Sequence, residues 1–282
     1  MIIIKKADDF DQWRKKESLS VGFVPTMGAL HRGHLSLVKK SIAMCNKTVV
    51  SIFLNPTQFG PNEDLESYPK TIESDMRLLH SAGVDVLFLP DEKEMYSRVD
   101  SVQVPESPLF KKLEGKSRPH FFFGVTTIVA KLFNVINPSH AFFGKKDAQQ
   151  LIIIRQMIQK MKYSIKLVPV ETKRDANGLA LSSRNQYLND SQQREASIIF
   201  KGFEKIKKNI INGEKNCRVL KKIFVDFISK NKNFNIDYIS IADIQTLEEL
   251  IEVPPKHYLV STAIFFNNIR LIDNFDYSQL DT

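Results

Sequence analysis

The chain has 282 residues, 43% of them hydrophobic and 26% charged, and a formal net charge of +8. This is the composition of a globular protein with one large domain or two ordinary ones, and it excludes a disordered chain. Excess positive charge suits nucleic acid, membranes or small anions. Because no arginine-rich run or aromatic platform accompanies it, we expect a lysine-rich solvated surface and no nucleic-acid partner.

Cysteine usage and the N-terminal sequence indicate the compartment. The two cysteines have neither metal-ligand spacing nor a CxxC pair, which suits a reducing environment. The first apolar run, MIII, is followed at once by lysines, so it is too short for a signal peptide. No window is long and apolar enough to span a bilayer. We therefore expect a cytoplasmic protein with no membrane partner.

Apolar strand patterns alternate with helical patterns over the first 170 residues, which is typical of a parallel sheet covered on both faces. The expected strands are residues 2–4, 21–26, 47–54, 84–89, 101–104, 140–143 and 164–170. The expected helices are residues 7–17, 35–44, 71–82, 125–135 and 148–161. This pattern predicts an α/β fold with a doubly wound parallel sheet.

The pattern changes near residue 172, where a long polar loop leads into two lysine-rich amphipathic helices. Strands are then expected over residues 237–241, 258–266 and 269–273, with Asn267-Asn268 as a hairpin turn between the last two. We predict a first domain of residues 1–174 and a smaller C-terminal α+β domain of residues 175–282.

A glycine-bearing stretch, PTMGALHRGH at residues 25–34, joins a predicted strand to a helix. Gly28 and Gly33 permit a sharp turn and close approach of a ligand. Free N–H groups at a helix start attract anions, and His31 and His34 share one face of the first turn. The stretch predicts a phosphate-binding loop; the alternative is a pair of capping or surface histidines.

Two further stretches point to ligand binding. LSSRN at residues 181–185 places paired hydroxyls and an arginine on the interdomain loop, which suits a polyphosphate clamp. GKKDAQQ at residues 144–150 follows a strand, at the edge where open parallel sheets bind ligands.

These motifs carry a family resemblance. HRGH resembles the HIGH signature of class I aminoacyl-tRNA synthetases and nucleotidylyltransferases, and LSSR resembles their KMSKS loop. More narrowly, PTMGALHRGHLSLV, FLNPTQFGPNEDLESYP, LEGKSRP, FFGKKDAQQL and GLALSSRNQYL resemble the pantothenate synthetase family, in that order, and IRLIDN near the C-terminus also fits. The resemblance implies a Rossmann-like nucleotidyltransferase domain with a C-terminal lid, and a homodimer.

The resemblance also implies a reaction, the ATP-dependent condensation of (R)-pantoate with β-alanine to pantothenate, on the route to coenzyme A. Pantoate would first form a pantoyl adenylate with release of pyrophosphate, and β-alanine would then displace AMP. ATP would be the co-substrate and Mg²⁺ the cofactor. Catalysis by positioning and charge neutralisation needs no enzyme nucleophile.

Site residues follow from the resemblance, position by position. It assigns ATP binding to Met27, Gly28, Ala29, Leu30, His31, Arg32, Gly33, His34, Gly144, Lys145, Lys146, Asp147, Lys173, Leu181, Ser182, Ser183 and Arg184. It assigns catalytic roles to His34, His31, Lys146 and Arg184. It places pantoate and β-alanine at Gln58 and pantoate at Gln150, since an amide both donates and accepts. Asp75 matches a proposed Mg²⁺ ligand; the alternative is an ordinary helix-surface carboxylate.

The chain departs from the family pattern at four positions. Lys145 replaces the usual glutamate, and Lys173 stands where valine is more common. Phe121 and Phe123 stand at the family's histidine and arginine, which leaves the contribution of this segment open.

Two other functions remain possible from the sequence. The first is another nucleotidylyltransferase of the superfamily, acting on a phosphate ester. The second is a non-catalytic RNA-binding protein descended from a tRNA synthetase, for which the basic charge is the argument.

Overall fold

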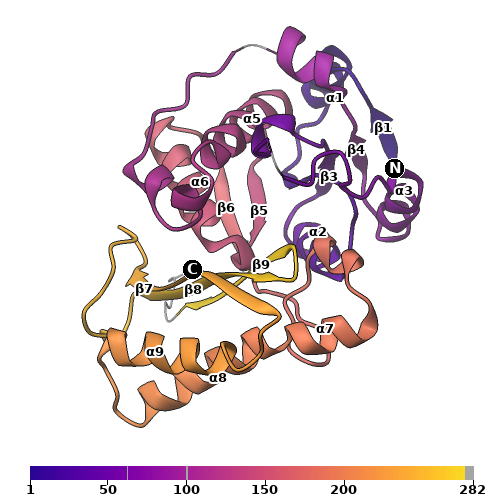
Figure 1. Cartoon of the computed structure of the whole chain (residues 1–282). Helices are drawn as coiled ribbons and strands as arrows, with labels where there is room; N and C mark the ends of the chain where they lie inside the picture. Colours follow the sequence, from indigo (N-terminus) through magenta and orange to yellow (C-terminus); the bar gives the residue numbers. More distant parts are fainter. Residues whose placement is uncertain (62, 100, 277–282) are drawn as a thin grey trace.

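The computed structural model describes residues 1–61, 63–99 and 101–276. Its N-terminal part is built on a six-stranded parallel sheet with the strand order β1-β4-β3-β2-β5-β6 (Figure 1). The strands are β1 (Ile2–Ile4), β2 (Val21–Thr26), β3 (Lys47–Ile52), β4 (Val86–Phe88), β5 (His140–Gly144) and β6 (Lys166–Val170). The order runs outward in both directions from β2 and β5, which confirms the predicted doubly wound sheet.

Helices cover both faces of this sheet. One face packs on α1 (Ala7–Lys16), α5 (Phe121–Ile136) and α6 (Ala148–Lys160), and the other on α2 (Arg32–Met44) and α3 (Ile72–Ser81). Neighbouring residues of β3 therefore enter different cores: Val49 belongs to the first and Val50 to the second. Burial on both faces explains why these strands are continuous apolar runs.

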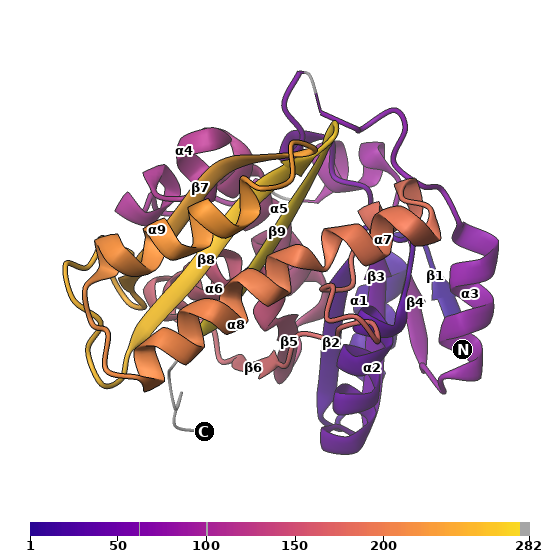
Figure 2. The same cartoon turned by 60° about the horizontal axis from the view of Figure 1, so that its bottom comes forward.

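The C-terminal part is an antiparallel sheet with the strand order β7-β8-β9 and its own apolar core. Its elements are α7 (Asp190–Ala196), α8 (Ile198–Ile211), α9 (Cys217–Ile228), β7 (Phe234–Asp243), β8 (Tyr258–Phe266) and β9 (Ile269–Asp276). Helices α8 and α9 cover the outer face of the sheet, and its other face turns toward the large domain (Figures 1 and 2). The predicted hairpin turn is confirmed, since Phe266 pairs with Ile269 and Asn267 adopts a φ of 51°.

The remaining elements are short. They are the 3₁₀ helices η1 (Pro56–Gln58), η3 (Pro108–Lys111), η4 (Lys145–Asp147) and η5 (Ser183–Tyr187), the π-helical turn η2 (Glu94–Arg98), and α4 (Glu114–Ser117). The strand predicted over residues 101–104 is wrong, because this segment pairs with no strand of the described chain. Its alternating pattern arises because Val102 and Val104 pack against the apolar core under α1, α5 and α6, although the segment is not part of the sheet. Among the described residues, no helix is long and apolar enough to cross a membrane.

Candidate active site

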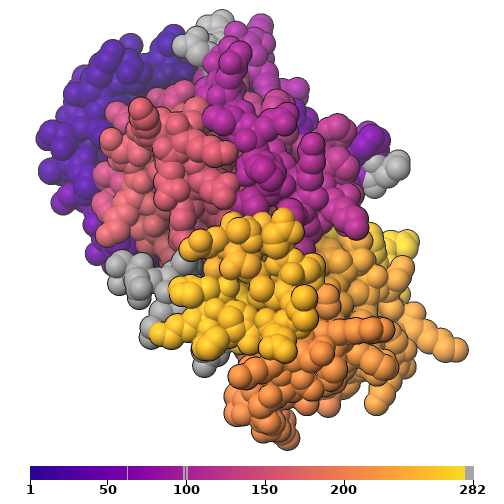
Figure 3. All heavy atoms as spheres, turned by 90° about the vertical axis from the view of Figure 1, so that its left-hand side faces the viewer, coloured from indigo at the N-terminus to yellow at the C-terminus, as the bar shows by residue number. Residues whose placement is uncertain are grey.

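A cleft opens where the strand order of the large sheet reverses. Strands β2 and β5 are neighbours there, with Phe23 opposite Ala141, and the chain leaves their carboxyl ends in opposite directions. The cleft has a volume of about 1030 Å³ and is lined from both domains. Such a switch point is where open α/β sheets bind ligands. Figure 3 shows the C-terminal domain packed closely against the large domain.

The loop after β2 is held in a tight left-handed turn. Gly28 has a φ of 85° and Ala29 a φ of 50°. The buried carboxylate of Asp75 accepts hydrogen bonds from the backbone N–H groups of Ala29 and Leu30, each at 2.9 Å, and from the Thr71 hydroxyl at 3.1 Å. Asp75 therefore braces the loop from behind and does not line the cleft. Its magnesium role stays a prediction.

Both histidines cap α2 and also line the cleft. The His31 Nδ1 accepts from the backbone N–H of Gly33 at 3.0 Å, and the His34 Nδ1 accepts from that of His31 at 3.3 Å. A Cβ at Gly33 would lie 2.7 Å from the His31 ring, so a larger residue here would displace that ring. Because each Nδ1 accepts, each neutral ring carries its proton on Nε2, which is thereby a donor.

The two imidazoles are uncharged at neutral pH. Burial, followed by the nearby Lys146 ammonium, lowers the pKa of His31 to about 4. Burial lowers the pKa of His34 to about 3, with His31 and Lys146 adding to the effect. The loop thus offers two neutral donors rather than two cations.

The stretch after β5 provides a cation. The Lys146 Nζ lies in the cleft, 3.7 Å from the Asp147 carboxylate. The Asn274 side chain on β9 donates to the carbonyls of Lys145 (3.1 Å) and Lys146 (2.6 Å), which ties this stretch to the small domain. The Lys145 side chain is not part of the cleft lining, and its Nζ pairs with Glu171 at 2.5 Å.

The LSSRN stretch contacts the loop after β2, although the two are far apart in the sequence. The Ser183 hydroxyl donates to the Ala29 carbonyl at 3.0 Å. Arg184 lines the cleft and donates to both carboxylate oxygens of Asp64 at 2.9 and 2.7 Å. The two predicted phosphate-binding motifs therefore adjoin each other, and both line one cleft.

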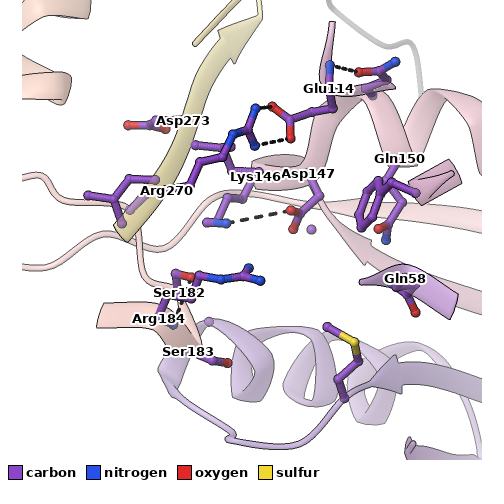
Figure 4. A pocket seen from close by; sticks show the side chains of 18 of the residues that line it. Gln58, Glu114, Lys146, Asp147, Gln150, Ser182, Ser183, Arg184, Arg270 and Asp273 are labelled. Carbon is purple, nitrogen blue, oxygen red and sulfur yellow. Dashed lines mark hydrogen bonds and ion pairs between the residues drawn. The ribbon is translucent and has the colours of Figure 1, made fainter. Parts of the chain in front are cut away.

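The two glutamines occupy another side of the cleft. Figure 4 shows Gln58 and Gln150 on one side and Arg184 on the other, with Asp147 between them. Gln58 is fixed by the buried side chain of Asn55, whose Nδ2 donates to its Oε1 at 3.0 Å. A polyanion and a small polar acid can therefore lie side by side here.

The predicted site residues divide into two groups. The cleft is lined by Met27, His31, Gly33, His34, Gln58, Gly144, Lys146, Asp147, Gln150, Lys173, Leu181, Ser182, Ser183 and Arg184. The residues that do not line it are Gly28, Ala29, Leu30, Arg32, Asp75 and Lys145. The N–H groups of Ala29 and Leu30 are bonded to Asp75, which explains why this part of the loop is not open to a ligand.

Several residues in or next to the cleft were not predicted from the sequence. Asn55 lies within the resembling segment but gave no signal of its own. The Arg118 guanidinium lies 3.8 Å from the centroid of the Phe121 ring and bonds to Glu63, whereas Phe123 is 57% exposed and lies outside the cleft. Only spatial contacts across long sequence separations reveal these roles.

Comparison with known proteins identifies the family. Residues 2–276 match the model of the pantoate-beta-alanine ligase family. The chain belongs to this family. The pantothenate synthetase of Caldicellulosiruptor saccharolyticus is 44% identical over 96% of both chains, and that of Leptospira biflexa is 42% identical over 97% of this chain and 98% of the relative.

Solved structures of pantoate–β-alanine ligases have the same fold. Pantothenate synthetase from Thermus thermophilus is 37% identical, with a TM-score of 0.92 over 98% of this chain and 99% of that one. The Francisella tularensis enzyme, complexed with beta-gamma ATP and beta-alanine, is 33% identical, with a TM-score of 0.78 over 98% of each chain. These matches confirm the predicted family, fold class and ATP-dependent ligase activity.

Proposed function

We propose that this cleft ligates pantoate to β-alanine with consumption of ATP, and that residues of both motifs contact the nucleotide phosphates. The observation that carries the proposal is their convergence: Ser183 bonds to Ala29, and His31, His34, Lys146 and Arg184 line one cleft. Neutral donors and cations that line the same cleft suit a polyphosphate. Gln58 and Gln150 then bind the acid beside it.

In the first step, a pantoate carboxylate oxygen attacks the α-phosphorus of ATP, and the bond to the bridging oxygen breaks. Pyrophosphate leaves with the electron pair of that bond. Lys146 and Arg184 neutralise the negative charge that develops on the phosphates. The Nε2–H groups of His31 and His34 donate hydrogen bonds to phosphate oxygens.

In the second step, the β-alanine amine attacks the acyl carbon of pantoyl adenylate. The new C–N bond replaces the acyl C–O bond, AMP leaves with the electron pair of that bond, and the amine nitrogen loses a proton to solvent. Gln58 orients the acyl group, and Asn55 fixes Gln58. The protein acts by holding the reacting groups in place, which is worth several kcal/mol in such reactions.

We propose that magnesium enters as the complex with ATP. The described residues contain no cluster of three or more histidine, cysteine, aspartate or glutamate side chains that suits a metal. Asp75 directs its oxygens at the loop N–H groups. Magnesium on nucleotide phosphates needs few protein ligands, so the phosphates and water supply its coordination sphere.

We further propose a cytoplasmic homodimer with a domain boundary between residues 174 and 175. The family resemblance supports the dimer, and the edge strand β1 offers an apolar surface, with Ile2 54% and Ile3 46% exposed. The boundary is supported by the end of the large sheet at Val170. Sedimentation of the purified chain tests the dimer.

A product assay tests the proposed reaction. With ATP and pantoate, the chain is expected to exchange pyrophosphate into ATP, and to release AMP in stoichiometry with pantothenate only when β-alanine is added. A stable nucleotide product from a phosphate ester would favour the other nucleotidylyltransferases. Affinity for tRNA with a steep salt dependence, and no AMP release, would favour the RNA-binding protein.

A further inference from the structure

Arg118 lies in the cleft with its guanidinium bound to a carboxylate of the protein itself. Its Nε donates to the Glu63 Oε1 at 2.6 Å, and its Nη2 bonds to the other oxygen of Glu63. The same Nη2 donates to the Gln58 carbonyl at 2.9 Å, and the guanidinium lies against the Phe121 ring. This is the two-pronged geometry with which arginine recognises a free carboxylate.

The next residue of the loop, Asp64, forms the same kind of paired hydrogen bonds with a second arginine, Arg184. Asp64 accepts two hydrogen bonds from Arg184, and the Tyr187 hydroxyl adds a third at 3.2 Å. Arg184 is the arginine proposed above for the ATP phosphates. Two consecutive carboxylates of one loop thus occupy two cleft arginines, one of them at a proposed anion site.

The chemistry of the two substrates, pantoate and β-alanine, decides which of their carboxylates Arg118 would bind. The pantoate carboxylate is the nucleophile, and a bidentate arginine on both of its oxygens would reduce its nucleophilicity. The β-alanine carboxylate does not react and keeps its charge throughout, so it needs a permanent cation in a partly desolvated site. Arg118 bonds to the backbone of Gln58, at the acid side of the cleft, and only 14% of its side chain is exposed.

We propose that Arg118 binds the carboxylate of β-alanine, and that Glu63 occupies this position in the free enzyme. The inference rests on the proposed function and deepens it by assigning the amino-acid subsite. β-Alanine displaces the Glu63 carboxylate from the guanidinium, and its amine is then held near the acyl carbon beside Gln58. Glu63 is therefore an internal competitor of the amino-acid substrate.

The variant Glu63→Gln tests this competition. Without the competing charge, a larger fraction of the enzyme has a free Arg118, so the KM for β-alanine is expected to fall several-fold while the KM for pantoate stays the same. Glu66→Gln is the matched control, since Glu66 is exposed in the same loop and does not line the cleft. Steady-state pantothenate formation measures both constants.

Arg118→Lys supplies a second test. The lysine keeps the charge but loses the paired hydrogen bonds, so the KM for β-alanine is expected to rise about tenfold. The KM for pantoate, measured by ATP–pyrophosphate exchange, is expected to change much less. Thermal unfolding of each variant shows whether it has folded, and the two substitutions predict opposite shifts in the KM for β-alanine.

Three outcomes would overturn the assignment. An unchanged or raised KM for β-alanine in Glu63→Gln would mean that Glu63 does not compete. A shift confined to pantoate would place the other acid at Arg118, and an unchanged KM for β-alanine in Arg118→Lys would remove Arg118 from the subsite. Failure of the proposed function is seen separately, because the unmodified chain would then form no pantothenate.

Discussion

At the scale of single residues, the buried histidines of the cleft stay uncharged in mild acid, whereas the same histidines become protonated in the unfolded chain. The pKa of His34 is about 3 in the folded protein against 6.5 for a free histidine. Below pH 6.5 the unfolded chain therefore binds a proton that the folded chain does not, and the protein loses stability as the pH falls toward 3.

His34→Gln is expected to reduce this acid sensitivity. Glutamine can still accept from the His31 N–H but does not titrate. When the pH is lowered from about 7 to about 4.5, both proteins lose unfolding free energy. The variant should lose less than the unmodified chain, by about 1 kcal/mol or more. Urea unfolding at both pH values measures it. An equal loss of stability in both proteins would show that His34 titrates normally.

Arg184 also belongs to the residue scale. Arg184→Lys keeps a positive charge but cannot make two parallel hydrogen bonds to a phosphate. We expect the rate of pyrophosphate exchange to fall about 10- to 100-fold, with a much smaller change in thermal stability. Arg194→Lys, on the exposed face of α7, is the control. An equal loss of folding and activity would make Arg184 a structural residue.

At the scale of elements, the packing of α5 on η1 positions the acid side of the cleft. A Cβ on Gly124 would lie 2.3 Å from the Thr57 carbonyl oxygen, so the two backbones touch. The buried Asn55 donates both to the Gly124 carbonyl at 3.2 Å and to Gln58. The position of α5 therefore sets the position of the Gln58 amide.

Gly124→Ala is expected to move η1 although alanine favours the helix itself. We expect the unfolding free energy to fall by about 1–3 kcal/mol and the KM for pantoate to rise more than that for ATP. Phe123→Ala, on the exposed side of the same helix, is the control. Unfolding in urea and pyrophosphate exchange give the two readings. Equal changes in the KM for both substrates would contradict the coupling to Gln58.

The sequence predicted the elements in which buried apolar residues recur in a regular pattern. The bounds of β2 and β8 were predicted correctly, because both are apolar runs flanked by turn signals. The helix expected from residue 35 begins at Arg32, since His31 and His34 supply an unusual capping box. The contact of Asn55 with Gly124 and the pairs of Arg118 with Glu63 join segments separated by 55 or more residues, so no local pattern predicts them.

At the scale of the whole molecule, an ionic network around the buried Glu114 carboxylate holds the small sheet against the large domain. Arg270 on β9 donates to both oxygens of Glu114 on α4, at 2.6 and 3.1 Å, and to Asp237 on β7 at 2.6 Å (Figure 4 shows the Glu114 pair). Tyr238 donates to Glu114 at 2.8 Å. These partners come from both domains. They close the side of the cleft that lies away from the loop after β2.

Arg270→Met is expected to open this side of the cleft. Methionine keeps much of the side-chain volume but leaves the Glu114 carboxylate, of which only 9% is exposed, without its cation. Loss of one partner of such a buried pair costs about 3 kcal/mol or more, and this cost falls on the closed arrangement. We expect a larger radius of gyration by small-angle X-ray scattering and a higher KM for ATP.

The matched control is Lys222→Met, which breaks an exposed pair with Asp226 within α9, where both side chains are more than half exposed. Such surface pairs contribute about 0–1 kcal/mol, so neither size nor KM should change. If Arg270→Met lowers stability while the radius of gyration and the KM for ATP stay constant, the network stabilises a fixed body. If all three change together, the contact between β9 and α4 sets how tightly the two domains enclose the nucleotide.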